Sequence, residues 1–106
     1  MTTKKFTGKL IAIDMYNCSE KIIKDEAAAK EQLQQACNSF GLQPCDIIPR
    51  EEEEQSEYSL FAICKQGHVT LHIYPNMGFA TADVFSCMEG AEPENVAKFL
   101  RTYFDA

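Results

Sequence analysis

Three apolar segments in the second half of the chain follow one another with short interruptions, and they limit the possible folds more than any other feature. Residues 58–65, 68–74 and 79–87 alternate or run apolar. Turn-forming residues separate them at positions 66–67 (Gln-Gly) and 75–78 (Pro-Asn-Met-Gly). This pattern predicts three consecutive strands in an antiparallel meander.

The rest of the chain predicts further strands and two helices. Residues 6–16 carry a period-two apolar pattern and residues 43–50 contain a second short apolar run, so we expect a strand in each. Residues 25–40 combine helical spacing with good helix formers, and Gly41 follows as a stop signal. A last amphipathic helix starts at Pro93. We summarise the order as β-α-β-β-β-α: an α+β two-layer sandwich, with helices on one face of a mainly antiparallel sheet.

Length and charge exclude several classes of protein. With 106 residues, the chain fits one domain spanning 1–106. Ten Lys and Arg against 16 Asp and Glu give a formal net charge of -6, which argues against a nucleic-acid partner. The acidic run at 51–54 is expected to be a solvated loop. No apolar run approaches the ~20 residues of a membrane-spanning helix, and no signal-peptide core is visible, so we expect a cytoplasmic protein without membrane insertion.

The cysteines and histidines give no metal signature. Five cysteines are an odd number without a C-x-x-C pair, which indicates neither a disulfide framework nor a zinc site and favours reduced thiols: Cys18, Cys37, Cys45, Cys64 and Cys87. His68 and His72 lie four residues apart and would share one face of a strand. Since no third ligand stands at a convincing spacing, we expect no metal there.

Residues 66–87 resemble a known processing site. They read QGHVTLHIYPNMGFATADVFSC, which is similar to the pattern E-S-H-x-T-x-H-x-x-P-E-x-G-Y-A-x-x-D-x-F-x-C of the short bacterial S-adenosylmethionine decarboxylases. Nine positions are identical: His68, Thr70, His72, Pro75, Gly78, Ala80, Asp83, Phe85 and Cys87. The resemblance implies the α+β fold, a homodimer and a place in polyamine (spermidine) metabolism.

Three departures from this pattern remove chemically active groups. Gly67 stands at the serine of the family pattern, Gln66 at the preceding glutamate and Asn76 at the later one. In the family the serine hydroxyl attacks the preceding carbonyl, and the resulting ester eliminates to leave a pyruvoyl group. Decarboxylation of an amino acid needs such an electron sink, because ordinary side chains supply none. We therefore predict no processing and no pyruvoyl cofactor.

The resemblance also assigns roles to other positions. It implies that His72 and Ser59 assist processing, and that Cys87 returns a proton to the substrate carbon. It places Tyr74 and Asn76 against the nucleoside part of the ligand. Burial and ordinary hydrogen bonding explain the serine, the histidine and the cysteine as well as present catalysis does, so we interpret them as inherited positions.

Three functions are compatible with these residues. The first is a pseudoenzyme that binds an S-adenosylmethionine-like ligand or regulates an active homologue. The second is a genuine decarboxylase whose serine has been substituted by Gly67 in this version of the chain. The third is a different reaction that uses His72 and Cys87 as an acid/base or nucleophilic pair.

Overall fold

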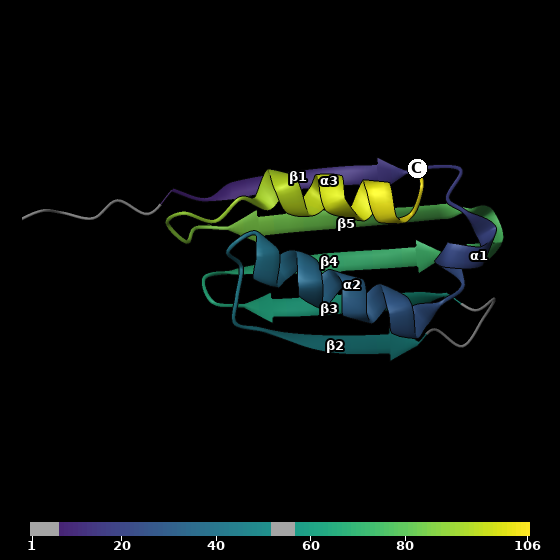
Figure 1. Cartoon of the computed structure of the whole chain (residues 1–106), viewed down its shortest axis with the longest axis horizontal. Coiled ribbons are helices and arrows are strands. Elements are labelled where there is room, and N and C mark those ends of the chain that lie inside the picture. Colours follow the sequence, from purple (N-terminus) through teal and green to yellow (C-terminus); the bar gives the residue numbers. More distant parts are fainter. Residues whose placement is uncertain (1–6, 52–56) are drawn as a thin grey trace, which may run out of the picture.

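A five-stranded antiparallel sheet forms one layer of the molecule (Figure 1). The computed structural model describes residues 7–51 and 57–106. Across the sheet the strands lie in the order β1-β5-β4-β3-β2, and every neighbouring pair is antiparallel. Their bounds are β1 (Lys9–Met15), β2 (Cys45–Glu51), β3 (Tyr58–Cys64), β4 (Gly67–Tyr74) and β5 (Phe79–Ser86). The predicted meander of three strands is confirmed as β3-β4-β5.

The element order differs from the prediction in two ways. Four consecutive strands, β2 to β5, stand between the long helices, so the predicted order β-α-β-β-β-α is one strand short, although each strand segment carried its own signal. A short helix, α1 (Glu20–Ile23), also forms between the predicted first strand and the predicted helix at 25–40, where no element was predicted. Its Ile23 is fully buried, and the Ile23 carbonyl accepts a hydrogen bond from the Tyr58 hydroxyl at 2.9 Å. Burial and this tertiary contact stabilise a turn that local sequence does not reveal.

The two longer helices begin where the sequence predicts. α2 (Glu26–Ser39) follows Asp25, whose carboxylate accepts the backbone N–H of Ala28 at 3.0 Å and so caps the helix. α3 (Pro93–Tyr103) has its proline in the first turn, where the missing N–H costs no helical hydrogen bond. In the described residues no helix is long and apolar enough to cross a membrane.

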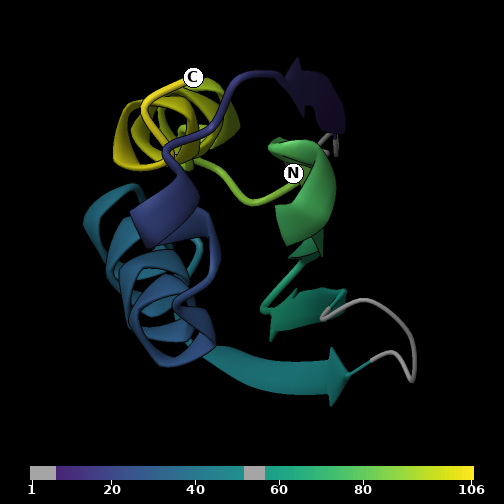
Figure 2. The ribbon, with the colours of Figure 1, turned by 90° about the vertical axis from the view of Figure 1, so that its right-hand side faces the viewer.

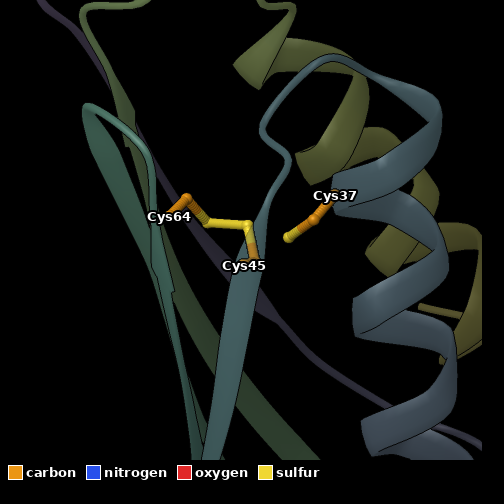
Figure 3. Close-up of side chains that lie close together, drawn as sticks. All are labelled: Cys37, Cys45 and Cys64. Atoms are coloured by element: carbon orange, nitrogen blue, oxygen red, sulfur yellow. A yellow bond between two sulfur atoms is a disulfide. The ribbon is translucent and has the colours of Figure 1, made fainter.

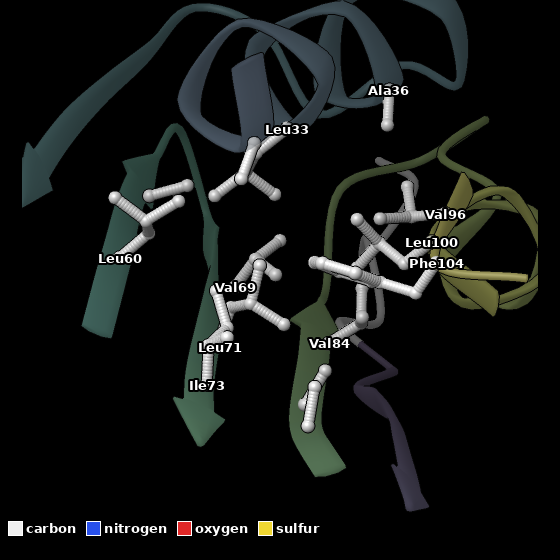
Figure 4. Close-up of a cluster of buried hydrophobic side chains, with 14 of the residues drawn as sticks. Leu33, Ala36, Leu60, Val69, Leu71, Ile73, Val84, Val96, Leu100 and Phe104 are labelled. Carbon is white, nitrogen blue, oxygen red and sulfur yellow. The ribbon is translucent and has the colours of Figure 1, made fainter. Parts of the chain in front are cut away.

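Both longer helices cover the same face of the sheet, which confirms the predicted α+β two-layer architecture (Figure 2). Large apolar side chains from α2, α3 and the sheet meet between the layers (Figure 4). Each of the following is at most 1% exposed: Leu33, Ala36, Leu60, Val69, Leu71, Ile73, Val84, Val96, Leu100 and Phe104. Burying a Val, Leu, Ile or Phe side chain stabilises the fold by roughly 1.5–3 kcal/mol relative to exposure. This core fixes the sheet on which the candidate site lies.

Two turns set the positions of the site residues. Gln66 closes the turn between β3 and β4 with a φ of 57°, an unusual value for a residue with a side chain. The 3-10 helix η1 (Pro75–Met77) joins β4 to β5 and ends at Gly78, whose φ of 61° lies in the left-handed region. The predicted turn at 75–78 is confirmed, and the turn predicted at 66–67 lies one residue earlier, at 65–66, because Gly67 already belongs to β4.

The prediction of reduced thiols is wrong for one pair. Cys45 of β2 and Cys64 of β3 form a disulfide, with their Cα atoms 4.1 Å apart. The two residues lie directly opposite each other in the antiparallel pair. Strand register creates this pairing, and a cysteine count without a C-x-x-C motif cannot reveal it. Cys18, Cys37 and Cys87 are free thiols. In the acidic run Glu51 ends β2, and residues 52–54 lie outside the described residues.

Candidate functional site

The face of the sheet opposite the helices carries most of the predicted site residues. Along β4, Val69, Leu71 and Ile73 are buried against the helices, so the alternate residues point to the other face. His72 and Tyr74 belong to that alternate set. We call this second side the open face, because α2 and α3 lie on the opposite side of the sheet (Figure 2).

A row of polar residues crosses the open face from one edge strand to the other. Residues from all five strands lie opposite one another in register: Arg50, Ser59, His72, Thr81 and Asp14. The Thr81 hydroxyl donates to Oδ1 of Asp14 at 2.8 Å. We call these five residues the polar row. Arg50 and Thr81 carried no signal in the sequence, because only the register of the strands places them beside His72.

Ser59 and His72 form a hydrogen-bonded pair at the centre of the polar row. Oγ of Ser59 lies 2.8 Å from Nδ1 of His72. Ser59 is only 4% exposed, and the Phe61 ring meets the imidazole edge to face at 5.7 Å between centroids. A hydroxyl and an imidazole at this distance can exchange a proton. The structure therefore joins two residues that the sequence suggested separately.

A second group of site residues lies where β3 turns into β4. The carbonyl oxygen of Gln66 accepts the backbone N–H of Cys87 at 2.9 Å, and the Cys87 thiol lies 3.5 Å from the same oxygen. Two donors aimed at one carbonyl oxygen polarise it, as an oxyanion hole does. We call Gln66, Gly67 and Cys87 the hairpin end. It holds a carbonyl that accepts two hydrogen bonds, without a side-chain nucleophile at the next residue.

The backbone around Gly67 leaves no room for a side chain. A Cβ atom added at Gly67 would lie 2.3 Å from the carbonyl oxygen of Phe85 and 3.1 Å from Cα of Ser86. Both atoms belong to the backbone of β5, so rotation of a side chain cannot relieve the contact. Any residue other than glycine at position 67 would force β4 and β5 apart at this point.

The polar row and the hairpin end lie far apart within one chain. His72 follows Gly67 by five residues along β4, which corresponds to roughly 17 Å. Cys87 lies beside Gly67, because Ser86 is the register partner of Gly67. The hypothesis of a His72–Cys87 pair within one chain is therefore wrong, since proton transfer between two groups requires hydrogen-bond distance or one bridging water.

Tyr74 and Asn76 lie at the opposite end of β4 from Gly67. The Tyr74 ring stacks on Phe79 at 5.8 Å between centroids, and Phe79 contacts Tyr16 at 5.2 Å. Asn76 lines a shallow cavity of about 370 Å³ together with Cys18, Glu20, Lys24, Pro75 and Gly78. The three aromatic rings offer stacking surface, and the cavity, whose lining includes none of them, offers hydrogen-bonding groups.

Residues 9–106 match the family model described as S-adenosylmethionine decarboxylase. The chain is 25% identical to the S-adenosylmethionine decarboxylase proenzyme of Methanococcus aeolicus, over 93% of this chain and 84% of the relative. It is 29% identical to the proenzyme of the same name from a Synechococcus species, over 89% of this chain and 73% of that protein.

A solved structure has the same fold. The crystal structure of the adenosylmethionine decarboxylase from Aquifex aeolicus superposes with a TM-score of 0.71, over 96% of this chain and 83% of the other. The two sequences are 17% identical, so this likeness supports the two-layer architecture alone.

Proposed function

Because the chain belongs to the S-adenosylmethionine decarboxylase family, we propose that it is a non-processing member of that family: a pseudoenzyme of polyamine metabolism that binds an S-adenosylmethionine-like ligand or regulates an active homologue. The observation that carries the proposal is the lack of room for a side chain at Gly67. This residue lacks a hydroxyl, and the β5 backbone excludes the side chain that would supply one.

The residues of the hairpin end do not fit the formation of a pyruvoyl group. Self-processing needs a nucleophile on the residue that follows the polarised carbonyl. Here the carbonyl of Gln66 has its two donors from Cys87, but Gly67 offers only hydrogen at its Cα. Without that group the chain has no electron sink for decarboxylation, and Cys87 has no carbanion to protonate.

Residues near Tyr74, at the end of β4 away from Gly67, support the proposal of a retained ligand site. The rings of Tyr74, Phe79 and Tyr16 form a contiguous aromatic surface that suits a purine base. Asn76 lines a cavity with Glu20 and Lys24, whose charged groups form a salt bridge with each other at 2.9 Å. In place of a glutamate, Asn76 cannot make the charge-assisted hydrogen bonds that a carboxylate makes to ribose hydroxyls. We therefore expect weaker nucleoside binding than a carboxylate at position 76 would give.

The same proposal includes a homodimer formed through the open face. Leu10, Ile48 and Ile63 point to that face and are 63%, 47% and 57% exposed. Exposed apolar side chains spread over one sheet face favour burial against another copy. With a two-fold axis between the two regions, the polar row of one copy would face the hairpin end of the other. Light scattering should report a dimer, and Ile63→Lys should yield monomers; a monomeric wild-type chain would contradict this part of the proposal.

Calorimetric titration of the uncleaved chain with S-adenosylmethionine tests the proposed function. Intact mass should show one full-length chain, and we expect saturable binding in the micromolar range. Tyr74→Ala should weaken that binding, because it removes stacking surface, whereas Tyr103→Ala on the helix side should not. Absence of binding heat with both S-adenosylmethionine and its decarboxylated form would remove the ligand-binding role and leave regulation of a homologue.

Decarboxylase activity of the purified chain would contradict the proposed function. If the purified chain released carbon dioxide from S-adenosylmethionine at a rate above that of a heat-denatured control, the pseudoenzyme proposal would be wrong. A serine codon at position 67 of the source gene would favour the alternative of a genuine decarboxylase. That alternative must also explain Gln66 and Asn76, which depart from the family pattern independently of Gly67.

A further inference from the structure

Three sulfur atoms meet on the side of the sheet that faces the helices, away from the open face (Figure 3). Cys37 comes from α2, Cys45 from the start of β2 and Cys64 from the end of β3. All three Sγ atoms lie within 4.8 Å of one another. We call these residues the sulfur cluster. Neither the family resemblance nor the proposed function uses it.

Two of the three sulfurs are bonded in this structure, and the third points toward them. Cys45 and Cys64 form the disulfide, and Figure 3 shows the Cys37 side chain directed from α2 toward Cys45. Cys37 is fully buried. Burial also raises the pKa of its thiol to about 12, so the thiolate needed for attack on the disulfide is scarce at neutral pH. An internal exchange of disulfide partners is therefore disfavoured, and reduction by an external thiol is the simpler reaction.

Reduction would turn the sulfur cluster into three neighbouring thiols. Two molecules of a small thiol each give up one hydrogen and become joined in a disulfide, while the Cys45–Cys64 bond breaks and each sulfur gains one hydrogen. The Cα atoms of the two cysteines are fixed by strand pairing, with seven register pairs between β2 and β3. The two thiols therefore stay side by side, and Cys37 remains within reach of both.

We propose that the reduced chain binds one thiophilic d10 cation through Cys37, Cys45 and Cys64, and that monovalent copper fits this set best. A metal–sulfur distance of about 2.3 Å places three thiolates in a plane roughly 4 Å apart. The sulfurs of Cys45 and Cys64, which are bonded in the disulfide, must therefore move apart by roughly 2 Å after reduction, which a change of their side-chain rotamers can supply. Among the described residues no fourth His, Cys, Asp or Glu joins the cluster. Thiolates bind both zinc and monovalent copper, but structural zinc sites use four protein ligands, so a set of three thiolates favours monovalent copper.

Metal binding would also favour loss of the proton from the buried Cys37 thiol. A bound cation favours thiolates and releases their protons, which offsets the cost of ionising Cys37 inside the core. The disulfide and the metal complex exclude each other, because a sulfur in a disulfide cannot serve as a thiolate ligand. The site would therefore exist only in the reduced chain.

Competition with a chromophoric copper chelator tests this site. The background is the Cys18→Ser/Cys87→Ser variant, which keeps only the three cysteines of the sulfur cluster. After reduction with a phosphine and its removal without oxygen, this chain should take one monovalent copper ion from the chelator. The same chain with its disulfide intact should take none. In a parallel titration zinc should bind more weakly than copper.

Cys37→Ala in this background separates a three-thiolate site from a simple dithiol. Loss of a group that only hydrogen-bonds to a metal ligand commonly weakens metal binding about 10–100-fold, so loss of a direct ligand should weaken copper binding by more than about 100-fold. Circular dichroism would verify that the variant is folded. If it is not, charge-transfer absorption of the reduced background chain still counts the bound thiolates, and three are expected. Unchanged copper affinity in folded Cys37→Ala, a count of two thiolates, or no copper uptake by the reduced background chain would overturn the proposal.

Discussion

The polar row and the hairpin end lie on the same sheet, but they differ in the reactive groups that they contain. In the polar row Ser59 and His72 still form a 2.8 Å hydrogen bond, and Thr81 donates to Asp14. The hairpin end still polarises the Gln66 carbonyl, yet it has neither a nucleophile at Gly67 nor space for one. Under the proposed function, the comparison teaches that a change at one residue can remove the start of a reaction while the surrounding scaffold stays intact.

The largest expected effect concerns the covalent link next to the hairpin end. Cys64 pairs in register with both Cys45 and Gly67, so the disulfide anchors the strand that carries the turn. The bridge closes a loop with a sequence separation of 19, which should stabilise the chain by about 3 kcal/mol. Urea unfolding before and after metal-free reduction would measure this. An unchanged midpoint would mean that the hairpin end does not depend on the disulfide.

Gly67→Ser should destabilise the chain by about 2 kcal/mol, because the new side chain overpacks against β5. Gly90→Ser is a matched control, since a Cβ at Gly90 meets nothing within 4 Å but has an unfavourable φ of 85°. The control should cost about 1 kcal/mol. Denaturant unfolding of both variants would compare them. A smaller loss for Gly67→Ser than for Gly90→Ser would show that β4 and β5 can separate at little cost.

The hydrogen bond in the polar row should contribute about 1 kcal/mol of coupling energy. A double-mutant cycle with Ser59→Ala, His72→Ala and the double variant isolates this term. The expected result is that the two single losses sum to more than the loss in the double variant. Additive losses would mean that the polar row is only a set of neighbouring side chains, which would weaken its contrast with the hairpin end.

Cys37 in the sulfur cluster beneath the hairpin end should give the chain an alkaline pH dependence of stability. Burial raises the pKa of Cys37 from 9.0 to about 12, so the folded chain favours the neutral thiol. Its contribution to stability is complete below pH 9 and is lost as the pH rises from 9 toward 12. The stability difference between wild type and Cys37→Ala should shrink by about 1 kcal/mol between pH 9 and pH 10. A constant difference would contradict the burial of an ionisable thiol at this position.

Local signals predicted those parts of the fold that local chemistry determines. The helix at 25–40 and the turn at 75–78 were predicted, and in the structure Asp25 caps α2 and Gly78 ends the connection between β4 and β5. The disulfide and the polar row depend on the register between β2 and β3, and the acidic residues between these strands carry no turn signal that would fix it. Likewise, the sequence showed that Gly67 lacks a hydroxyl, but only the approach of β5 shows that it lacks space.

Self-cleavage of Gly67→Ser is the measurement that tests the central claim most directly. The variant restores the hydroxyl next to the polarised Gln66 carbonyl, and intact mass spectrometry after prolonged incubation would follow the bond between residues 66 and 67. Our account predicts one chain of full mass, because the backbone of β5 prevents the hydroxyl from taking the position needed for attack. Two fragments, the second with a blocked amino terminus, would show that the hairpin end is still competent and that only the hydroxyl is missing.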